Sequence, residues 1–224
     1  MHVVFRESHG LEETETPFDL QQSPADLVVL SFSDSDLGAF AAGWHRAQGR
    51  LPTLRLANLA MLKHPLSVDV YAEQTLAGAK GILVRLIGGE SYWPYGLATL
   101  QDLARRQGMA LAVLPADGRV DPRLDALSTL PVSTLRRLQA LCDQGGAVAA
   151  QAALAQMALA AGLYAAPVSG AKAVPEAGFY RPGLGVVSEP VPGARPIALI
   201  PFYRAYLTAV DTGPVDALID ALEA

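Results

Sequence analysis

The stretch LSVDVYAEQTLAGAKGILVRLIGGESYWPYG, residues 66–96, decides the fold, because it predicts a helix, a strand and a loop in immediate succession. Its apolar run, residues 81–87, is interrupted only by Arg85 and lies between glycines. Such a run is typical of a strand buried on both faces, as in a parallel sheet. The aromatic-rich residues 90–96 are predicted to form a loop at the carboxyl end of this strand. That end is where open α/β sheets bind ligands.

The helix in this stretch has predicted boundaries on both sides. Ser67 is expected to be its N-cap, with Leu66 and Tyr71 forming a hydrophobic staple. Gly78 is expected to end the helix in a left-handed conformation. The predicted helix therefore lies between Ser67 and Gly78.

Outside this stretch, buried strands and amphipathic helices continue to alternate. Further strands are predicted at residues 2–5, 26–30 and 110–114. Ser33 is predicted to cap one helix, and a second, with apolar residues from 97 to 104, should end at Gly108. Residues 51–62 are apolar throughout and predict neither a helix nor a strand clearly. The pattern indicates an α/β fold, a flavodoxin/Rossmann-like parallel sheet with flanking helices.

The pattern changes in the second half of the chain. Residues 164–195 contain many prolines and glycines and are predicted to form a linker. Residues 196–200 then predict a strand and residues 211–222 a helix, which together resemble the start of a second α/β domain that is cut short. We therefore expect a piece of a longer protein. The predicted domains are 1–123 (α/β), 124–163 (helical extension), 164–195 (Pro/Gly-rich linker) and 196–224 (first strand and helix of a second α/β domain).

Composition narrows the class of protein. The 224 residues are 51% hydrophobic and carry a net charge of −5, which argues against a nucleic-acid-binding surface. Cys142 is the only cysteine, so no internal disulfide can form. The first residues do not have the pattern of a signal peptide, and the alanine-rich run at 147–161 is too short to span a membrane. A soluble, cytoplasmic protein is expected.

Motifs for catalysis are missing from the sequence. The histidines at positions 2, 9, 45 and 64 share no metal-ligand spacing, so no metal-binding residue is predicted. Gly88-Gly89 lacks the spacing and the lysine of a phosphate-binding loop. No nucleophile elbow is present either. No catalytic residue is therefore predicted.

One group of residues remains as a candidate binding site. Its glycines would let a flat ligand approach the backbone, its aromatic rings would stack on that ligand, and Arg85 would pair with its carboxylates. Alternatively, Arg85 is an edge residue or is ion-paired within the fold, and the aromatic rings only cover the end of the sheet. Tyr203 and Arg204 follow the predicted strand at 196–200 and either face a cleft or start a helix. The candidate substrate-binding residues are Arg85, Gly88, Gly89, Tyr92, Trp93, Tyr95, Tyr203 and Arg204.

Several blocks of the sequence resemble one family, and they occur in that family's order. They are SPADLVVLSFSDSDL at 23–37, LPTLRLANLAMLKHPLSVDVYAEQTL at 51–76, VRLIGGESYWPYGLATL at 84–100, DALSTLP at 125–131, AGFYRPG at 177–183 and IPFYRAYLTAVDTGPVDALIDALEA at 200–224. On these blocks the chain resembles the N-terminal portion of the CobN family, the large subunits of cobaltochelatase. This family is similar to the large subunit of magnesium chelatase.

The resemblance implies a part in the ATP-dependent insertion of Co²⁺ into hydrogenobyrinic acid a,c-diamide, in aerobic cobalamin (vitamin B12) biosynthesis. The large subunit holds the tetrapyrrole substrate, and smaller AAA-type ATPase subunits are its partners. Cobalt and ATP with Mg²⁺ would be handled by the full complex, so no cofactor is expected in this piece. The family's metal-handling residues are expected beyond Ala224, and this piece alone is expected to be inactive. The alternatives are a non-catalytic α/β scaffold and a small-ligand-binding module of flavodoxin type.

Overall fold

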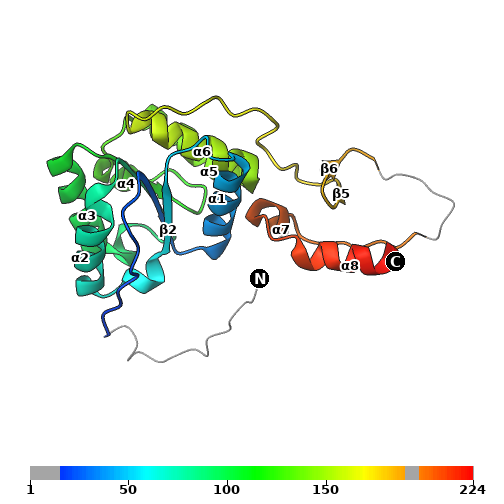
Figure 1. Cartoon of the computed structure of the whole chain (residues 1–224), viewed down its shortest axis with the longest axis horizontal. Coiled ribbons are helices and arrows are strands. Elements are labelled where there is room, and N and C mark those ends of the chain that lie inside the picture. The colour runs from blue at the N-terminus through cyan, green and yellow to red at the C-terminus, as the bar shows by residue number, and fades with distance from the viewer. Residues whose placement is uncertain (1–15, 190–196, 224) are drawn as a thin grey trace. The chain divides into compact units, whose positions relative to one another are not determined.

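The chain forms two compact units, each built from segments that are separate in the sequence. Figure 1 shows the elements of the chain, coloured from blue at the N-terminus to red at the C-terminus. A computed structural model describes residues 16–189 and 197–223. The first unit comprises Met1–Phe32 and Thr53–Pro131, and the second Ser33–Pro52 and Val132–Ala224. The strand predicted at residues 2–5 lies outside the described residues.

The first unit contains a four-stranded parallel sheet, which confirms the predicted α/β fold. Its strands are β1 (Leu27–Ser31), β2 (Leu54–Asn58), β3 (Gly81–Leu86) and β4 (Ala110–Pro115), in the order β2-β1-β3-β4. Every residue of β1, β3 and β4 is buried, as their continuous apolar runs predict. The segment that the sequence left open supplies β2, followed by the 3₁₀ turn η2 (Leu59–Leu62).

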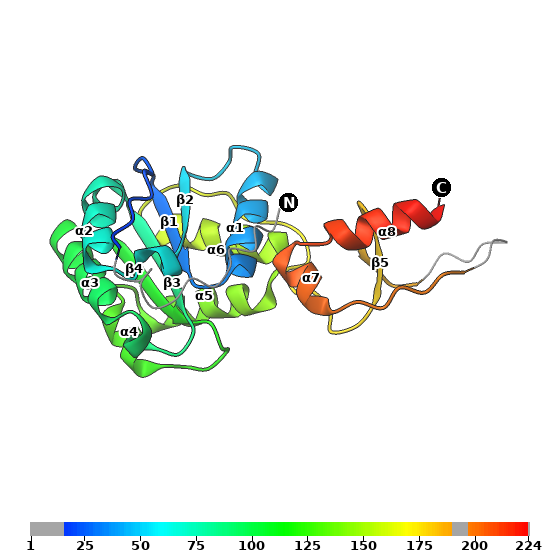
Figure 2. The same ribbon diagram turned by 90° about the horizontal axis from the view of Figure 1, so that it is seen from below.

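One face of this sheet packs on the helices α2 (Pro65–Gln74) and α3 (Pro94–Gln107), which lie next to each other (Figure 2). A short helix, α4 (Pro122–Leu127), contacts β4. The helix predicted to end at Gly108 does so, because Gly108 adopts the left-handed conformation that ends α3. The core on this face includes Val28, Leu30, Ile82, Val84, Leu111 and Val113 from the strands and Val68, Tyr71, Leu97 and Leu100 from the helices.

The predicted boundaries of α2 are wrong. His64 is the N-cap, its Nδ1 accepting a hydrogen bond of 3.1 Å from the backbone N–H of Leu66, and Pro65 opens the helix. Ser67 lies inside the helix, where its Oγ accepts a hydrogen bond of 2.7 Å from the N–H of Phe18. Leu66 is exposed, so no staple forms. The helix ends at Gln74, and Gly78 closes the separate 3₁₀ turn η3 (Leu76–Gly78) without a positive φ.

The loop predicted at residues 90–96 is mostly helical. Glu90–Tyr92 forms the 3₁₀ turn η4, and Pro94, Tyr95 and Gly96 belong to the first turn of α3. Pro94 fits there because the first residues of a helix need no backbone N–H donor. This early start of α3 sends the aromatic side chains in different directions.

The second unit contains α1 (Asp34–Arg46), α5 (Val132–Gln144) and the alanine-rich α6 (Gly146–Ala160). Ser33 caps α1 as predicted, its Oγ accepting a hydrogen bond of 3.2 Å from the N–H of Asp36. α1 and α6 approach so closely that a Cβ on Gly43 would lie 2.6 Å from the backbone nitrogen of Gln151. Small residues on both helices make this contact possible. No helix among the described residues is both long and apolar enough to cross a membrane.

The C-terminal part of this unit differs from the prediction in two places. The stretch expected to be a structureless linker contains an antiparallel hairpin, β5 (Phe179–Arg181) and β6 (Gly185–Val187). Residues 197–200, expected to be a strand, are not one. The short helix α7 (Arg204–Ala209) follows, and α8 (Gly213–Glu223) forms where a helix was predicted. The domain ranges 1–123, 124–163, 164–195 and 196–224 stay predictions.

Tyr71 leads to a prediction about stability at high pH. Its hydroxyl, buried in the core, donates a hydrogen bond of 2.9 Å to Gln22 Oε1, and burial raises the pKa of this phenol above 10.0 while the Arg55 charge lowers it to a smaller extent. The unfolded phenol ionises near pH 10 and the folded one does not, so the contribution of Tyr71 to stability should be constant below that pH and fall above it. Tyr71→Phe should lower the free energy of unfolding at pH 7 by about 1 kcal/mol and make the alkaline loss shallower.

Urea unfolding at pH 7, 10 and 11 measures this effect. Tyr164→Phe is the control, because that side chain is 84% exposed and its surroundings change little on unfolding. An alkaline loss of the same size in Tyr71→Phe and in the unsubstituted chain would contradict the prediction.

Candidate functional site

The strand order reverses between β1 and β3, since the chain runs outward from β1 to β2 and then returns to the other side of β1. At such a point the connections leave in opposite directions and the carboxyl ends of the strands border a crevice, which is where open α/β sheets bind ligands. Ser31 on β1 and Arg85 on β3 are register partners there. Asn58, the last residue of β2, is the register partner of Ser31 on its other side.

Ser31 and Arg85 lie on the sheet face opposite α2 and α3. Leu30, Val84 and Leu86 belong to the core that contacts those helices, and side chains alternate between the two faces of a strand. Ser31 is fully buried and Arg85 is only 4% exposed. A guanidinium stays charged when buried and has several N–H donors. Arg85 therefore places a fixed positive charge inside the protein at the switch point.

The turn after β3 depends on two glycines with positive φ, Gly88 at 86° and Gly89 at 81°. The ring of Tyr92 lies so close to Gly88 that a Cβ there would come 2.2 Å from its Cε2 atom. Tyr92 is nevertheless 63% exposed, and the neighbouring Ile87 is 48% exposed. A Cβ on Gly89 would lie 3.6 Å from Asp121 Oδ2, so the segment before α4 also reaches this turn. The turn therefore has the exposed ring of Tyr92 next to the glycine backbone at Gly88.

Trp93 points away from this turn. Its side chain is buried, and Nε1 donates a hydrogen bond of 2.7 Å to the backbone oxygen of Leu62. Gly96 leaves room for the ring, because a Cβ there would lie 2.0 Å from Trp93 Cε2. Trp93 belongs to the core against α2 and α3, on the other sheet face from Arg85. It is therefore a packing residue in this structure.

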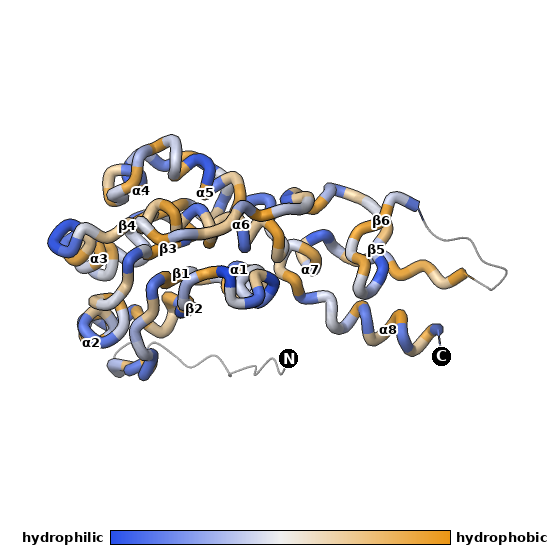
Figure 3. The backbone as a smooth tube through the Cα atoms, turned by 45° about the horizontal axis from the view of Figure 1, so that its top comes forward, coloured by the Kyte–Doolittle hydropathy of each residue, from blue (hydrophilic) through white to orange (hydrophobic). Residues whose placement is uncertain are grey.

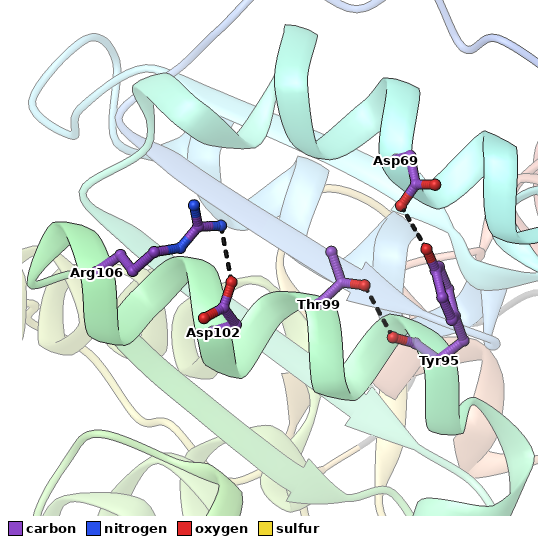
Figure 4. Close-up of polar contacts among 5 residues, drawn as sticks. All are labelled: Asp69, Tyr95, Thr99, Asp102 and Arg106. Atoms are coloured by element: carbon purple, nitrogen blue, oxygen red, sulfur yellow. Dashed lines mark hydrogen bonds and ion pairs between the residues drawn. The ribbon is translucent and has the colours of Figure 1, made fainter.

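Tyr95 connects two helices. Its hydroxyl donates a hydrogen bond of 2.8 Å to Asp69 Oδ1 on α2, and its backbone oxygen accepts one of 3.0 Å from Thr99 (Figure 4). The hydrogen bond to Asp69 raises the pKa of the Tyr95 phenol. Arg106 and Asp102 form an exposed ion pair of 2.8 Å further along α3. Tyr95 is thus turned toward α2 and not toward the glycine turn.

The remaining predicted residues belong to the second unit. The guanidinium of Arg204 donates to the backbone oxygens of Val174 at 2.8 Å and Pro175 at 3.1 Å. It fastens α7 to the preceding segment. Tyr203 lies at the N-terminus of α7 and is 82% exposed. These two residues therefore belong to a different unit from the turn after β3.

The structure therefore places Arg85, Gly88, Gly89 and Tyr92 at the end of β3, turns Trp93 and Tyr95 toward other partners, and assigns Tyr203 and Arg204 to the second unit. Sequence reasoning missed Ser31, Asn58 and Asp121. A polar residue that ends an apolar strand run is the signal that could have found Ser31. Asn58 Oδ1 accepts a hydrogen bond of 2.9 Å from the N–H of Ala60 and caps η2. The Arg85 cation, two hydroxyls and the Tyr92 ring in this part of the fold suit the binding of a ligand.

No three His, Cys, Asp or Glu side chains within residues 16–189 and 197–223 are grouped closely enough to hold a metal ion.

Comparison with known proteins identifies the relatives of this chain. It is 38% identical over 237 residues to the aerobic cobaltochelatase subunit CobN of Sinorhizobium sp, a match that covers 100% of this chain and 18% of the relative. The protein of the same name from Pseudomonas aeruginosa is 39% identical over 146 residues, or 65% of this chain and 12% of that one. The catalytic subunit of cobaltochelatase from Mycobacterium tuberculosis superimposes with a TM-score of 0.59 at 25% identity, over 88% of this chain and 15% of that structure. No family model matches the sequence.

An α/β unit with these relatives defines a chain of the metal-chelatase class. More particularly, the chain belongs to the CobN family of cobaltochelatase subunits, as a homologue of the N-terminal portion of those proteins. It spans less than a fifth of the length of these relatives, 18% and 12%.

The burial of Arg85 leads to a prediction about the stability of the sheet. Arg85→Ala removes a buried side chain and leaves its polar neighbours unsatisfied, so the free energy of unfolding should fall by about 3 kcal/mol. Arg106→Ala is the matched control, because that side chain is 68% exposed and its ion pair with Asp102 lies on the surface. The control should change stability by less than about 0.5 kcal/mol. Urea unfolding followed by circular dichroism measures both, and equal losses would show that Arg85 is not part of the core of the sheet.

Proposed function

We propose that this chain forms the N-terminal part of the tetrapyrrole-binding large subunit of an ATP-dependent cobaltochelatase. In this proposal the whole enzyme inserts Co²⁺ into hydrogenobyrinic acid a,c-diamide in aerobic cobalamin biosynthesis, as a ligase that forms metal–nitrogen bonds. The observation that carries the proposal is the 38% identity to a CobN subunit along the entire chain. The likeness to the cobaltochelatase structure from Mycobacterium tuberculosis supports it independently.

The site at the end of β3 has the chemistry that such a substrate requires. Hydrogenobyrinic acid a,c-diamide is a large conjugated ring with carboxylate side chains, so a protein recognises it by ring stacking and by positive charge. Tyr92 offers an exposed ring above the glycine backbone. Arg85, on the strand that leads into this turn, supplies a positive charge at the reversal point of the sheet. We propose Tyr92 as the contact residue and Arg85 as the source of the field that attracts the carboxylates.

ATP hydrolysis and cobalt supply would come from other parts of the complex. The sequence lacks a phosphate-binding loop, so in this proposal smaller AAA-type subunits hydrolyse ATP with Mg²⁺. Co²⁺ is a substrate of the reaction, and the residues that handle it would lie in the rest of a CobN-length chain. The 224 residues alone are therefore expected to insert no cobalt.

A non-catalytic scaffold is the second candidate function. It is favoured by the number of predicted site residues that the fold itself uses. Trp93 packs in the core, Arg204 fastens α7, and Arg85 is covered. In this alternative the N-terminal portion braces the large subunit and touches no substrate.

The two candidates differ in what they predict for Tyr92. In the full-length subunit, Tyr92→Ala should weaken binding of hydrogenobyrinic acid a,c-diamide about fivefold to tenfold, because it removes a stacking ring worth about 1 kcal/mol. Tyr95→Ala is the matched control, a tyrosine 45% exposed that bonds to Asp69, and it should change the Kd less than about twofold. Titration followed by the substrate's absorbance gives both values.

Equal affinities in Tyr92→Ala, Tyr95→Ala and the unsubstituted subunit would favour the scaffold. A full-length subunit that binds no tetrapyrrole at all would contradict the proposed function as a whole.

A further inference from the structure

The C-terminal part of the second unit exposes a set of large apolar side chains. We call it the C-terminal apolar face and define it by Ile197, Leu199, Leu218 and Leu222. Ile197 is 86% and Leu199 is 83% exposed, while Leu218 and Leu222 are about half exposed. Figure 3 shows the segment between the grey trace and α7 as strongly hydrophobic, with further hydrophobic positions along α8. Large apolar side chains exposed in this number within one short C-terminal part mark an interaction surface.

The extended part of this face has the sequence of a buried strand. Residues 197–200 read IALI, and Ile197 and Leu199 share one side of an extended chain. Among the described strands, none pairs with this segment. An apolar strand whose backbone groups have no strand partner readily pairs with another strand. Residues 197–200 thus have apolar side chains that suit a buried strand and backbone groups that no described strand pairs with.

The helical part of the face lies on α8. Val215, Leu218, Ile219 and Leu222 follow each other at intervals of three and four residues, so they share one face of the helix. Only Val215, in the first turn, is buried. The apolar side of α8 is therefore covered at its beginning and uncovered toward its end.

The start of α8 is held firmly, so this exposure is not due to a loose helix. The Tyr180 hydroxyl on β5 donates a hydrogen bond of 2.7 Å to Asp216 Oδ1 and lies 3.1 Å from Thr212 Oγ1. The Phe202 ring packs edge-on against Tyr180 and Tyr206, with centroids 5.6 Å and 6.4 Å away. These contacts tie the hairpin, α7 and α8 together and leave the apolar face pointing outward.

We propose that the C-terminal apolar face is covered by the segment that follows residue 224 in a CobN-length chain, and that this segment adds a parallel strand beside residues 197–200. A strand followed by a helix is completed by a second parallel strand next to the first, through a crossover over the helix. A segment attached directly to α8 also loses little entropy in reaching the face. This inference rests on the chain being part of a large subunit, since the match spans only 18% of a relative.

Cysteine labelling tests the inference in the 224-residue chain and in the full-length product of the same gene. Cys142 is first replaced by Ser, and Leu199→Cys and Leu218→Cys are introduced separately. Leu66→Cys is the matched control, because Leu66 on α2 is 50% exposed, close to the 47% of Leu218. Labelling with a maleimide at Leu199→Cys and Leu218→Cys should be at least about tenfold slower in the full-length protein. The control should react at equal rates in both.

Hydrogen exchange on the unsubstituted proteins tests the strand without any mutation. Amides of residues 197–200 should exchange quickly in the 224-residue chain and slowly in the full-length protein. Equal labelling and equal exchange in the two proteins would overturn the inference. Protection in the 224-residue chain that grows with its concentration would also overturn it, because a second copy would then occupy the face.

These outcomes are independent of substrate binding. Protection of the face in a subunit that binds no tetrapyrrole would support this inference and contradict the proposed function. Tetrapyrrole binding by a subunit whose C-terminal apolar face is unprotected would support the proposed function and contradict this inference.

Discussion

The parallel pairing of β1 with β3 is the constraint on which the first unit depends. Leu27 lies opposite Gly81 and Ser31 opposite Arg85, so the pairing runs the length of β1. All of these residues are buried, and a single step of register would move every side chain to the opposite face. The pairing also forces β2 and β4 to the two outer positions and creates the reversal of strand order. The polar group at the carboxyl ends exists because this register brings Ser31 and Arg85 together.

The short segment after β3 shows how a cluster in the sequence becomes several separate positions in space. Tyr92, Trp93 and Tyr95 lie within four positions, but the turn η4 and the start of α3 rotate them in different directions. Tyr92 faces solvent, Trp93 reaches the oxygen of Leu62, and Tyr95 reaches Asp69. Each residue in a helical turn is displaced by about 100° from the previous one. A cluster of aromatic residues is therefore a stronger signal of a site in a strand or loop than at the start of a helix.

The parts of the fold that could be predicted are those with strong local signals. The buried strands β1, β3 and β4 are continuous apolar runs, and the cap of α1 is a hydrogen bond within one turn of the chain. The start of α2 could not be predicted in this way, since His64 and Ser67 are both chemically able to cap a helix. The Ser67 hydroxyl oxygen instead accepts a hydrogen bond from the backbone N–H of Phe18, which is 49 residues away in the chain. Of the candidate site, the turn after β3 followed from sequence, whereas Ser31 and Asn58 required the strand register.

The contrast between residues 26–30 and 197–200 explains why an apolar run alone does not make a strand. DLVVL and IALI have similar side chains and similar intrinsic preference for extended backbone. The first run has β2 on one side and β3 on the other, so its backbone groups are satisfied and all of β1 is buried. The second has no strand neighbour among the described residues and keeps Ile197 and Leu199 in solvent. A strand is a property of a pair of segments, because only a partner satisfies its amides and carbonyls. Residues 197–200 therefore have the side chains of a strand but, among the described residues, not the partner segment that a strand requires.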